Sequence, residues 1–301
     1  MILPLMGYVP NPQGTEAFLR TLVHPTLATA GPNLALDETR DVFLGHALLA
    51  VDPTWKRGAQ QIGSCVGHAW AGAATLLSAL DITIRNEPEG YGGRVLEASV
   101  YGFARVEVQG KKNLGGDGSY GAAAAKAVTR YGTLHYGQDY GGKVFTESTG
   151  RLESDWGRNG VPDELEPYAA QHKVSSAVLV TDFESAAAAI QNAYPVPVCS
   201  GQGFSMTMRE GALSPMGHWS HAMLFCGLKW KPEPALYLLN SWGECYGGSV
   251  DKTLPPAFQR SGGWCDAATC TKMLSGEDSF AISGYSGFAP RKMPDWLGGV
   301  I

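Results

Sequence analysis

The sequence predicts an α+β protein with two packed lobes and a cleft between them. The first half of the chain is weighted toward helix, because small and apolar residues recur there at helical spacing. The second half is weighted toward strand, with several short apolar runs rich in β-branched residues. Hydrophobic residues make up 44% of the 301 residues and charged residues 17%, which is enough apolar material for a packed core.

The helices of the first half follow from three stretches. Residues 65–80 predict a buried helix, because alanine and leucine recur along them. Residues 121–131 predict an alanine-rich helix that ends at a glycine. A further helix is expected near residues 34–49, and residues 96–108 are ambiguous between helix and strand.

The second half predicts strands separated by one helix. We interpret residues 136–172 as loops, because they are polar and rich in glycine. Thr181 and Glu184 have the spacing of a capping box and predict a helix that starts there. The expected strands cover residues 174–180, 194–204, 221–228, 235–242 and 279–285.

Charge and hydropathy exclude several classes of partner. The net charge is −5 and the lysines and arginines are scattered, so we expect no nucleic acid partner. We find no apolar stretch of about 18 residues, so we expect no membrane span. The N-terminal stretch carries no early Lys or Arg and does not resemble a signal peptide. We therefore expect mostly reduced cysteines and a cytoplasmic or virion-associated protein.

The stretch "QQIGSC" places Cys65 at a helix start. Gly63 and Ser64 let the backbone turn, and free N–H groups at a helix N-terminus favour a thiolate. A cysteine in a buried alanine-rich helix is also a common structural residue. His68, in the first turn, is either packed or lines the cleft.

Two later stretches supply partners for a nucleophilic cysteine. His221 opens the apolar run "HAMLFCGL", and Asn240 ends the run "ALYLLN". Two adjacent antiparallel strands would bring these side chains together, and an asparagine oxygen can orient an imidazole ring. Trp242 could shield that hydrogen bond from water. His218 is the alternative base, less favoured because no strand begins directly at it.

In this order, Cys65, His221 and Asn240 resemble the catalytic residues of the papain-type cysteine peptidases. The resemblance rests on the motifs "QQIGSCVGHA", "SHAMLFCGL" and "LLNSWGECYGG" and covers about residues 55–285. In its details the sequence resembles a divergent bacterial and bacteriophage branch of this family. It implies a helical lobe with the cysteine helix and an antiparallel β-barrel-like lobe with His and Asn. The expected division is an N-terminal arm over 1–54, a peptidase domain over 55–290 (lobes about 55–165 and 166–290) and a tail over 291–301.

The resemblance implies peptide hydrolysis through a thioester, with a polypeptide substrate, no cofactor and no metal. Cys65 would be the nucleophile, His221 the base and acid, and Asn240 the residue that orients His221. Trp242 would cover the His–Asn pair and contact substrate.

The resemblance also implies two substrate-binding elements. Gly118 and Ser119 would bind the substrate backbone. A glutamine ahead of the cysteine would complete an oxyanion hole, and Gln60 is favoured over Gln61, although the usual offset from the cysteine falls on Ala59.

Two other site patterns are weak. Residues 116–121 match a Gly-rich dinucleotide motif, with Asp139 at a suitable distance, but no preceding strand and no βαβ pattern accompany them. Cys245, Cys265 and Cys270 lack the close pairing of a zinc site, and buried thiols are the favoured interpretation.

Alternative functions remain open at this point. A papain-like domain could serve as a structural or binding part of an assembly such as a phage virion, with residues 1–54 wrapping a partner. The same arm could act as an inhibitory pro-segment that occupies the cleft. A papain-like enzyme that cuts cell-wall peptides is a third alternative.

Overall fold

The computed structural model describes residues 5–85, 91–284 and 286–294. The helices are α1 (Pro12–Leu19), α2 (Leu27–Ala30), α3 (Gly45–Val51), α4 (Cys65–Arg85), α5 (Glu97–Gly102), a π-helix (Phe103–Val108), α6 (Gly121–Arg130), α7 (Gly150–Asn159), a 3-10 helix (Asp163–Leu165), α8 (Glu166–Ala169), α9 (Phe183–Gln191) and α10 (Ala267–Leu274). The strands are β1 (Val42–Phe43), β2 (Ser176–Leu179), β3 (Val196–Phe204), β4 (Thr207–Met208), β5 (Pro215–Lys229), β6 (Ala235–Leu239), β7 (Gly247–Gly248), β8 (Gly262–Asp266) and β9 (Phe280–Ser283).

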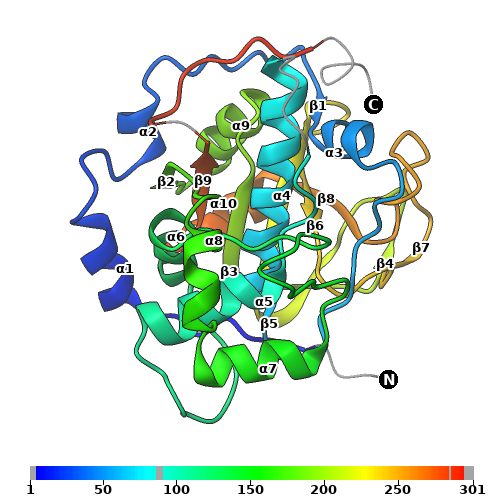
Figure 1. Ribbon diagram of the computed structural model, residues 1–301. Coiled ribbons are helices and arrows are strands. Elements are labelled where there is room, and N and C mark those ends of the chain that lie inside the picture. Colours follow the sequence, from blue (N-terminus) through cyan, green and yellow to red (C-terminus); the bar gives the residue numbers. More distant parts are fainter. Residues whose placement is uncertain (1–4, 86–90, 285, 295–301) are drawn as a thin grey trace.

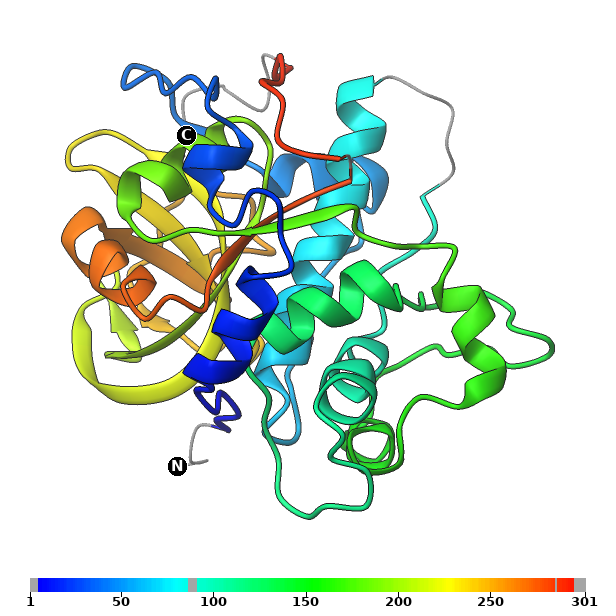
Figure 2. The same cartoon turned by 90° about the vertical axis from the view of Figure 1, so that its left-hand side faces the viewer.

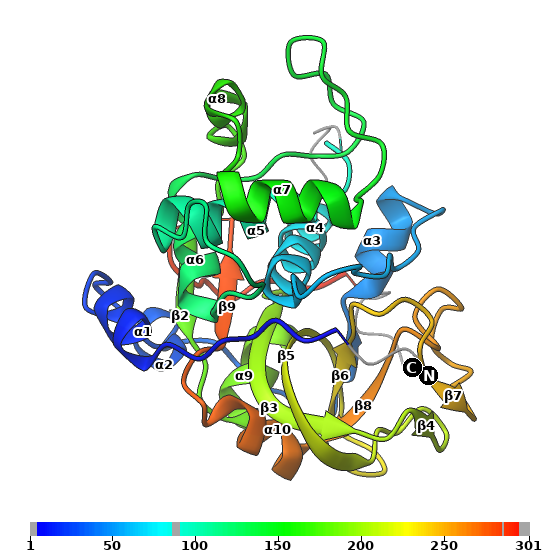
Figure 3. The same ribbon diagram turned by 90° about the horizontal axis from the view of Figure 1, so that it is seen from below.

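These elements form two lobes, as the sequence predicts. Figure 1 labels the elements, and the turned views of Figure 2 and Figure 3 show helices α4 to α8 on one side of the molecule and strands β3 to β8 with α9 and α10 on the other. Helix α4 is the central element, because it contacts α3, α5, α6 and β5. The seam between the lobes, which we call the lobe interface, therefore runs along α4 and β5.

Helix α4 confirms the predicted buried helix that begins at Cys65. Its small residues allow close packing, since a Cβ atom added at Gly67 would lie 2.8 Å from the Cβ atom of Tyr101. Contrary to our expectation, Cys65–Ile84 is long and apolar enough to cross a bilayer by length and composition. However, 78% of its most apolar window is buried inside the fold, as in the core helix of a globular protein.

The main sheet is antiparallel and centred on β5. Strand β5 pairs with β1, β3 and β6, and β8 pairs with the far edge of β6. The register sets Ser200 opposite His221 and Leu224 opposite Leu239. Because Asn240 directly follows β6, this pairing brings it toward the start of the buried part of β5.

The expectation of a barrel-like lobe is corrected by the topology. Among the described residues the sheet is open, with no pairing between β3 and β8. Helix α10 contacts β3, β6 and β8, so a helix joins the two edges where a barrel would need a strand ladder.

Several predicted elements are confirmed. Helix α6 matches the predicted alanine-rich helix, and β2, β3, β5, β6 and β9 overlap the five expected strands. Strand β5 begins at Pro215, well before the expected start at residue 221, and so includes His218. Residue 285, the last of the fifth expected strand, lies outside the described residues. The capping box of α9 is formed by Asp182 and Ser185, one residue later than expected, and Asp182 Oδ1 accepts a hydrogen bond of 2.7 Å from the Ser185 amide.

Other predicted elements are wrong. The helix expected over 34–49 is reduced to α3, because Val42 and Phe43 pair with Leu228 and Gly227 of β5 instead. Residues 1–54 also contain α1 and α2, so this segment is less irregular than expected. The ambiguous stretch 96–108 is helical throughout most of its length.

The predicted loop over 136–172 contains helix α7. Thr149 accepts a hydrogen bond of 3.1 Å from the Leu152 amide and caps this helix. Only a few of its residues are buried, among them Glu153 and Trp156, so its polar exposed face concealed it in the sequence.

Candidate active site

Cys65 is the first residue of α4 and is fully buried at the lobe interface. The Ala222 amide on β5 donates a hydrogen bond of 3.3 Å to its sulfur atom. The thiol therefore lies beside the residue that follows His221. Burial raises the pKa of Cys65 to about 12, only partly offset by hydrogen bonds from backbone groups that include Ala222 and Gly7.

His221 and Asn240 are in direct contact. His221 Nε2 lies 2.8 Å from Asn240 Oδ1. The orientation of the Asn240 amide group is fixed, because its Nδ2 atom donates a hydrogen bond of 3.1 Å to the Tyr246 hydroxyl group. The amide oxygen must therefore accept from His221, so the imidazole carries its proton on Nε2. This leaves His221 Nδ1 as the proton acceptor.

His221 Nδ1 is buried and has no hydrogen-bond partner among the described residues. Burial lowers the pKa of His221 to about 4, with the hydrogen bond to Asn240 acting in the opposite direction. In this state the thiol and the imidazole are therefore both neutral at neutral pH.

Aromatic rings cover the His–Asn pair. The Trp242 ring stacks on the His221 ring with a centroid distance of 4.4 Å and an interplanar angle of 27°. Trp219 packs edge-on against Trp242 at 4.9 Å. These rings exclude water from the hydrogen bond that orients His221, as the sequence predicts for Trp242.

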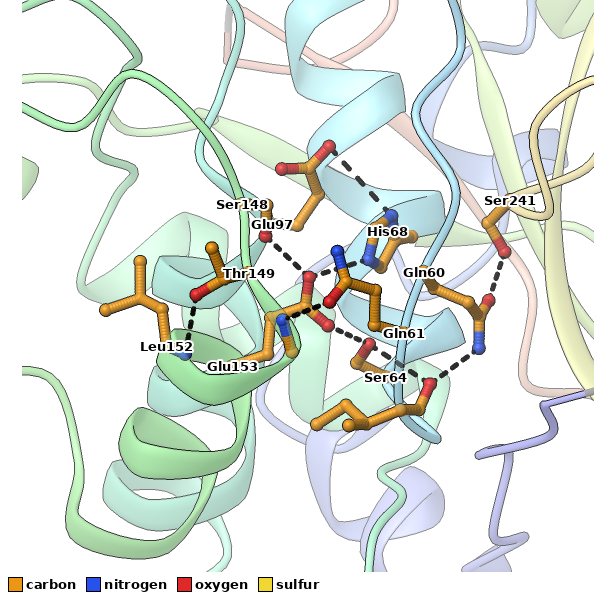
Figure 4. A network of polar contacts seen from close by, with 12 residues as sticks. Gln60, Gln61, Ser64, His68, Glu97, Ser148, Thr149, Leu152, Glu153 and Ser241 are labelled. Atoms are coloured by element: carbon orange, nitrogen blue, oxygen red, sulfur yellow. Dashed lines mark hydrogen bonds and ion pairs between the residues drawn. The ribbon is translucent and has the colours of Figure 1, made fainter.

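The two candidate oxyanion residues differ in position. Gln60 is buried, and its Oε1 atom accepts a hydrogen bond from the Ser241 hydroxyl group (Figure 4). Gln60 Nε2 donates to the carbonyl oxygen atoms of Ile62 at 2.9 Å and Leu5 at 3.2 Å. Gln61 is exposed and accepts a hydrogen bond from the Gly150 amide. Of the two glutamines, only Gln60 faces the lobe interface, where its Nε2 donor group binds Ile62 and the Leu5 carbonyl oxygen of the arm.

Residues 5–9 of the arm cross the lobe interface between the helical lobe and β5 (Figure 3). The Gly7 backbone forms a hydrogen bond to the Cys65 thiol. The Leu5 carbonyl oxygen accepts hydrogen bonds from Gln60 Nε2 at 3.2 Å and Trp242 Nε1 at 3.1 Å. The Tyr8 amide donates to the Ser220 carbonyl oxygen at 3.0 Å. This segment therefore binds both lobes and covers the thiol.

Gly118 and Ser119, the predicted substrate-binding residues, bind this same segment. The Ser119 amide donates to the Gly7 carbonyl oxygen at 2.9 Å, and the Val9 amide donates to the Ser119 carbonyl oxygen at 2.8 Å. A Cβ atom at Gly118 would lie 2.9 Å from the Gly7 carbonyl oxygen, so a glycine is needed for this close approach.

Asp278 is a site residue that the sequence did not indicate. It lies beside the nearly buried Tyr8 side chain and accepts hydrogen bonds from Thr15 Oγ1 at 2.9 Å and from the Gly121 amide at 2.7 Å. Burial raises the pKa of Asp278 to about 6. It precedes β9 in a polar stretch that carries no recognisable motif, so only the fold brings it to the arm.

The remaining predicted residues lie elsewhere. His218 is on β5 but exposed, and its Nε2 atom lies 3.4 Å from the Ser220 hydroxyl group. It does not share the buried environment of Cys65. His68 is buried in the first turn of α4, where it binds Glu153 rather than lining the lobe interface.

Comparison with solved structures identifies the architecture. The model aligns with xylellain, a cysteine protease from Xylella fastidiosa, with a TM-score of 0.59 and 16% identity, over 92% of this chain and 95% of that chain. The chain has the papain-like fold. Procathepsin L 3 of Tenebrio molitor (TM-score 0.50, 14% identity, 93% and 83% covered) and procathepsin B S9 of Trypanosoma congolense (0.51, 14%, 92% and 85%) are also similar. No protein-family model and no curated protein sequence matches the chain.

Proposed function

We propose that this chain is a cysteine peptidase with Cys65, His221 and Asn240 as its catalytic residues. The observation that carries the proposal is the 2.8 Å contact between His221 and Asn240, which leaves an unpartnered Nδ1 on the residue next to Ala222, whose amide binds the Cys65 sulfur. These are the groups that acyl transfer by a thiolate requires.

The reaction follows from these roles. The Cys65 thiol gives its proton to His221 Nδ1, and the sulfur forms a bond to the carbonyl carbon of a peptide. The C–N bond then breaks, and the imidazolium returns the proton to the leaving amine. Water, deprotonated by His221, hydrolyses the thioester and regenerates the thiol. Gln60 Nε2 and the Cys65 amide would stabilise the oxyanion.

The arm supports a latent form of this enzyme. Residues 5–9 use the donors that a substrate backbone needs, namely Gln60 Nε2, Trp242 Nε1 and the Ser119 amide. A substrate can reach Cys65 only after this segment is displaced. We therefore propose that residues 5–9 act as an inhibitory segment.

The test is the pH dependence of Cys65 alkylation by iodoacetamide, read by peptide mass, together with hydrolysis of unfolded casein. We expect labelling and cleavage in the wild type after displacement of the arm, and loss of cleavage in Cys65→Ala and His221→Ala. If labelling rises only near the pKa of a free thiol and is unchanged in His221→Ala, no thiolate–imidazolium pair forms and the proposal fails. A structural role in an assembly would then be favoured.

A further inference from the structure

A buried polar cluster beneath the nucleophile is not used by the proposed reaction. In this cluster Ser64, which directly precedes Cys65, and His68, in the first turn of α4, both contact Glu153 of α7 (Figure 4). Glu153 has a relative exposure of 1% and His68 of 2%. Burial of an ionisable group at this depth is costly unless it is paired.

The Glu153 carboxylate contacts residues that precede and follow Cys65 in the sequence. One carboxylate oxygen, Oε2, accepts a hydrogen bond from the Ser64 hydroxyl group, which belongs to the residue before the nucleophile. The other, Oε1, lies 3.0 Å from His68 Nε2, one helical turn after Cys65, and accepts from the Ser148 hydroxyl group at 2.6 Å. One side chain therefore holds both ends of the first turn of α4.

This turn includes the amide of Cys65, which the proposed reaction uses in the oxyanion hole. That amide lies in the peptide unit formed with Ser64, so the position of Ser64 sets its direction. A small displacement of such a donor can cost about a hundredfold in rate.

The pair also affects the charge near the thiol. The charged groups that face it include Glu97, with Oε1 at 3.9 Å from His68 Nδ1, and Arg57, which donates to the His68 carbonyl oxygen at 3.3 Å. Two further titratable groups interact with the pair, Tyr136 with Glu153 and His221 with His68. A Glu153 carboxylate without a partner would add negative charge beside the first turn of α4 and oppose thiolate formation at Cys65, and His68 is the side chain placed to compensate that charge. Burial alone would raise the pKa of Glu153, but the charge of His68 and its hydrogen bonds hold that pKa below its usual value.

We propose that Glu153 and His68 form a buried ion pair that positions the first turn of α4 and keeps the surroundings of Cys65 free of excess negative charge. The inference rests on the proposed function, because it gives the pair a role in the same reaction. Neither residue touches substrate, so both are positioning residues.

The test uses the full chain with the arm displaced by Gly7→Ala, because a Cβ atom there would lie 1.8 Å from the Gly63 carbonyl oxygen. Two readouts are taken in this parent, the pH midpoint of Cys65 alkylation by iodoacetamide, and kcat and KM on a peptide substrate. His68→Gln keeps a donor to Glu153 but removes the compensating charge, and we expect it to raise the midpoint by about one pH unit. The double variant His68→Gln/Glu153→Gln removes both charges and should return the midpoint to near the wild-type value. A purely structural role would not produce this restoration.

Positioning is tested with Glu153→Ala, which should lower kcat by about a hundredfold with little change in KM. Glu153→Gln keeps the shape and should retain most of the rate. Asp155→Asn, an exposed residue of the same helix, is the matched control. Thermal unfolding shows whether each variant is folded. If Glu153→Ala is not folded, the midpoints of His68→Gln and of the double variant His68→Gln/Glu153→Gln decide.

The outcomes separate this inference from the proposed function. A Gly7→Ala parent that neither cleaves nor labels faster than a free thiol contradicts the proposed function itself. An active parent with unchanged midpoints in His68→Gln, or with equal kcat in Glu153→Ala and Asp155→Asn, overturns the inference alone.

Discussion

His221 Nε2 lies 2.8 Å from Asn240 Oδ1, and the Trp242 ring stacks over the imidazole at 4.4 Å. This contact fixes the tautomer in which Nδ1 carries no proton, and the proposed reaction needs that atom as its acceptor. The two residues lie 19 positions apart in the sequence and meet because β5 and β6 are paired antiparallel. The first prediction tests the contact directly.

Asn240→Ala should lower kcat/KM by about tenfold to a hundredfold, because the imidazole loses its orienting acceptor. The measurement is hydrolysis of a peptide substrate at matched concentrations of folded protein. The exposed Asn159→Ala serves as control and should keep the wild-type rate. Equal rates in the two variants would show that Asn240 does not orient the base.

The second prediction concerns the oxyanion hole. Gln60→Ala should lower kcat by about a hundredfold to a thousandfold, because a donor that stabilises the transition state is removed. Gln61→Ala should change kcat little, since Gln61 is exposed and binds Gly150. Steady-state kinetics of both variants decide between the two glutamines, and a larger loss in Gln61→Ala would reverse the assignment.

The third prediction concerns the arm. A Cβ atom at Gly7 would lie 1.8 Å from the Gly63 carbonyl oxygen, so Gly7→Ala cannot keep the observed path. We expect Cys65 to be alkylated by iodoacetamide at least about tenfold faster in this variant, because the arm no longer covers the thiol. The control is Gly58→Ala, where an added Cβ atom meets nothing within 4 Å. Unchanged labelling in Gly7→Ala would mean that residues 5–9 do not limit access.

The fourth prediction tests how the arm is anchored. The Tyr8 side chain is nearly buried beside Asp278, and its pKa is raised by burial and by the charge of Cys199 and Asp278. Tyr8→Ala should loosen the arm and increase the rate of Cys65 alkylation, whereas Tyr8→Phe keeps the packing and should increase it less. Labelling kinetics of the two variants against wild type check this order, and a faster rate in Tyr8→Phe than in Tyr8→Ala would contradict it.

The fifth prediction concerns stability and pH. Burial, with the nearby charges of Glu166 and Asp163, raises the pKa of Glu107 to about 7, and its Oε2 atom has no hydrogen-bond partner among the described residues. The folded state therefore holds this proton more tightly than the unfolded state, and stability is lost as the pH rises from about 4.5 to about 7.

Glu107→Gln removes that loss. After allowance for solvent screening, it should raise the free energy of unfolding by about 1 kcal/mol at about pH 8 and leave it unchanged at about pH 4. Thermal unfolding at the two pH values is the measurement, with the exposed Glu233→Gln as control. A gain that is equal at both pH values would rule out the titration of Glu107 as its cause.

Local sequence was sufficient for the elements that carry the candidate triad. The small and apolar residues after Cys65 have the spacing of a buried helix. The apolar runs at His221 and before Asn240 have the length and composition of strands. Helix α7 was not predictable in this way, because Leu152 and Trp156 are its only large apolar residues and its other positions are polar or glycine.

The sequence by itself therefore determined the lobes, the helix start at Cys65 and the strands that present His221 and Asn240, because hydrophobic spacing and turn residues act over short distances. The sequence favoured Gln60 over Gln61 and offered the arm as an occupant of the cleft. Only the tertiary structure places Gln60 at the lobe interface, residues 5–9 over Cys65, and Glu153 beside Ser64 and His68. Each of these depends on contacts between residues far apart in the chain, whose partners no local pattern specifies.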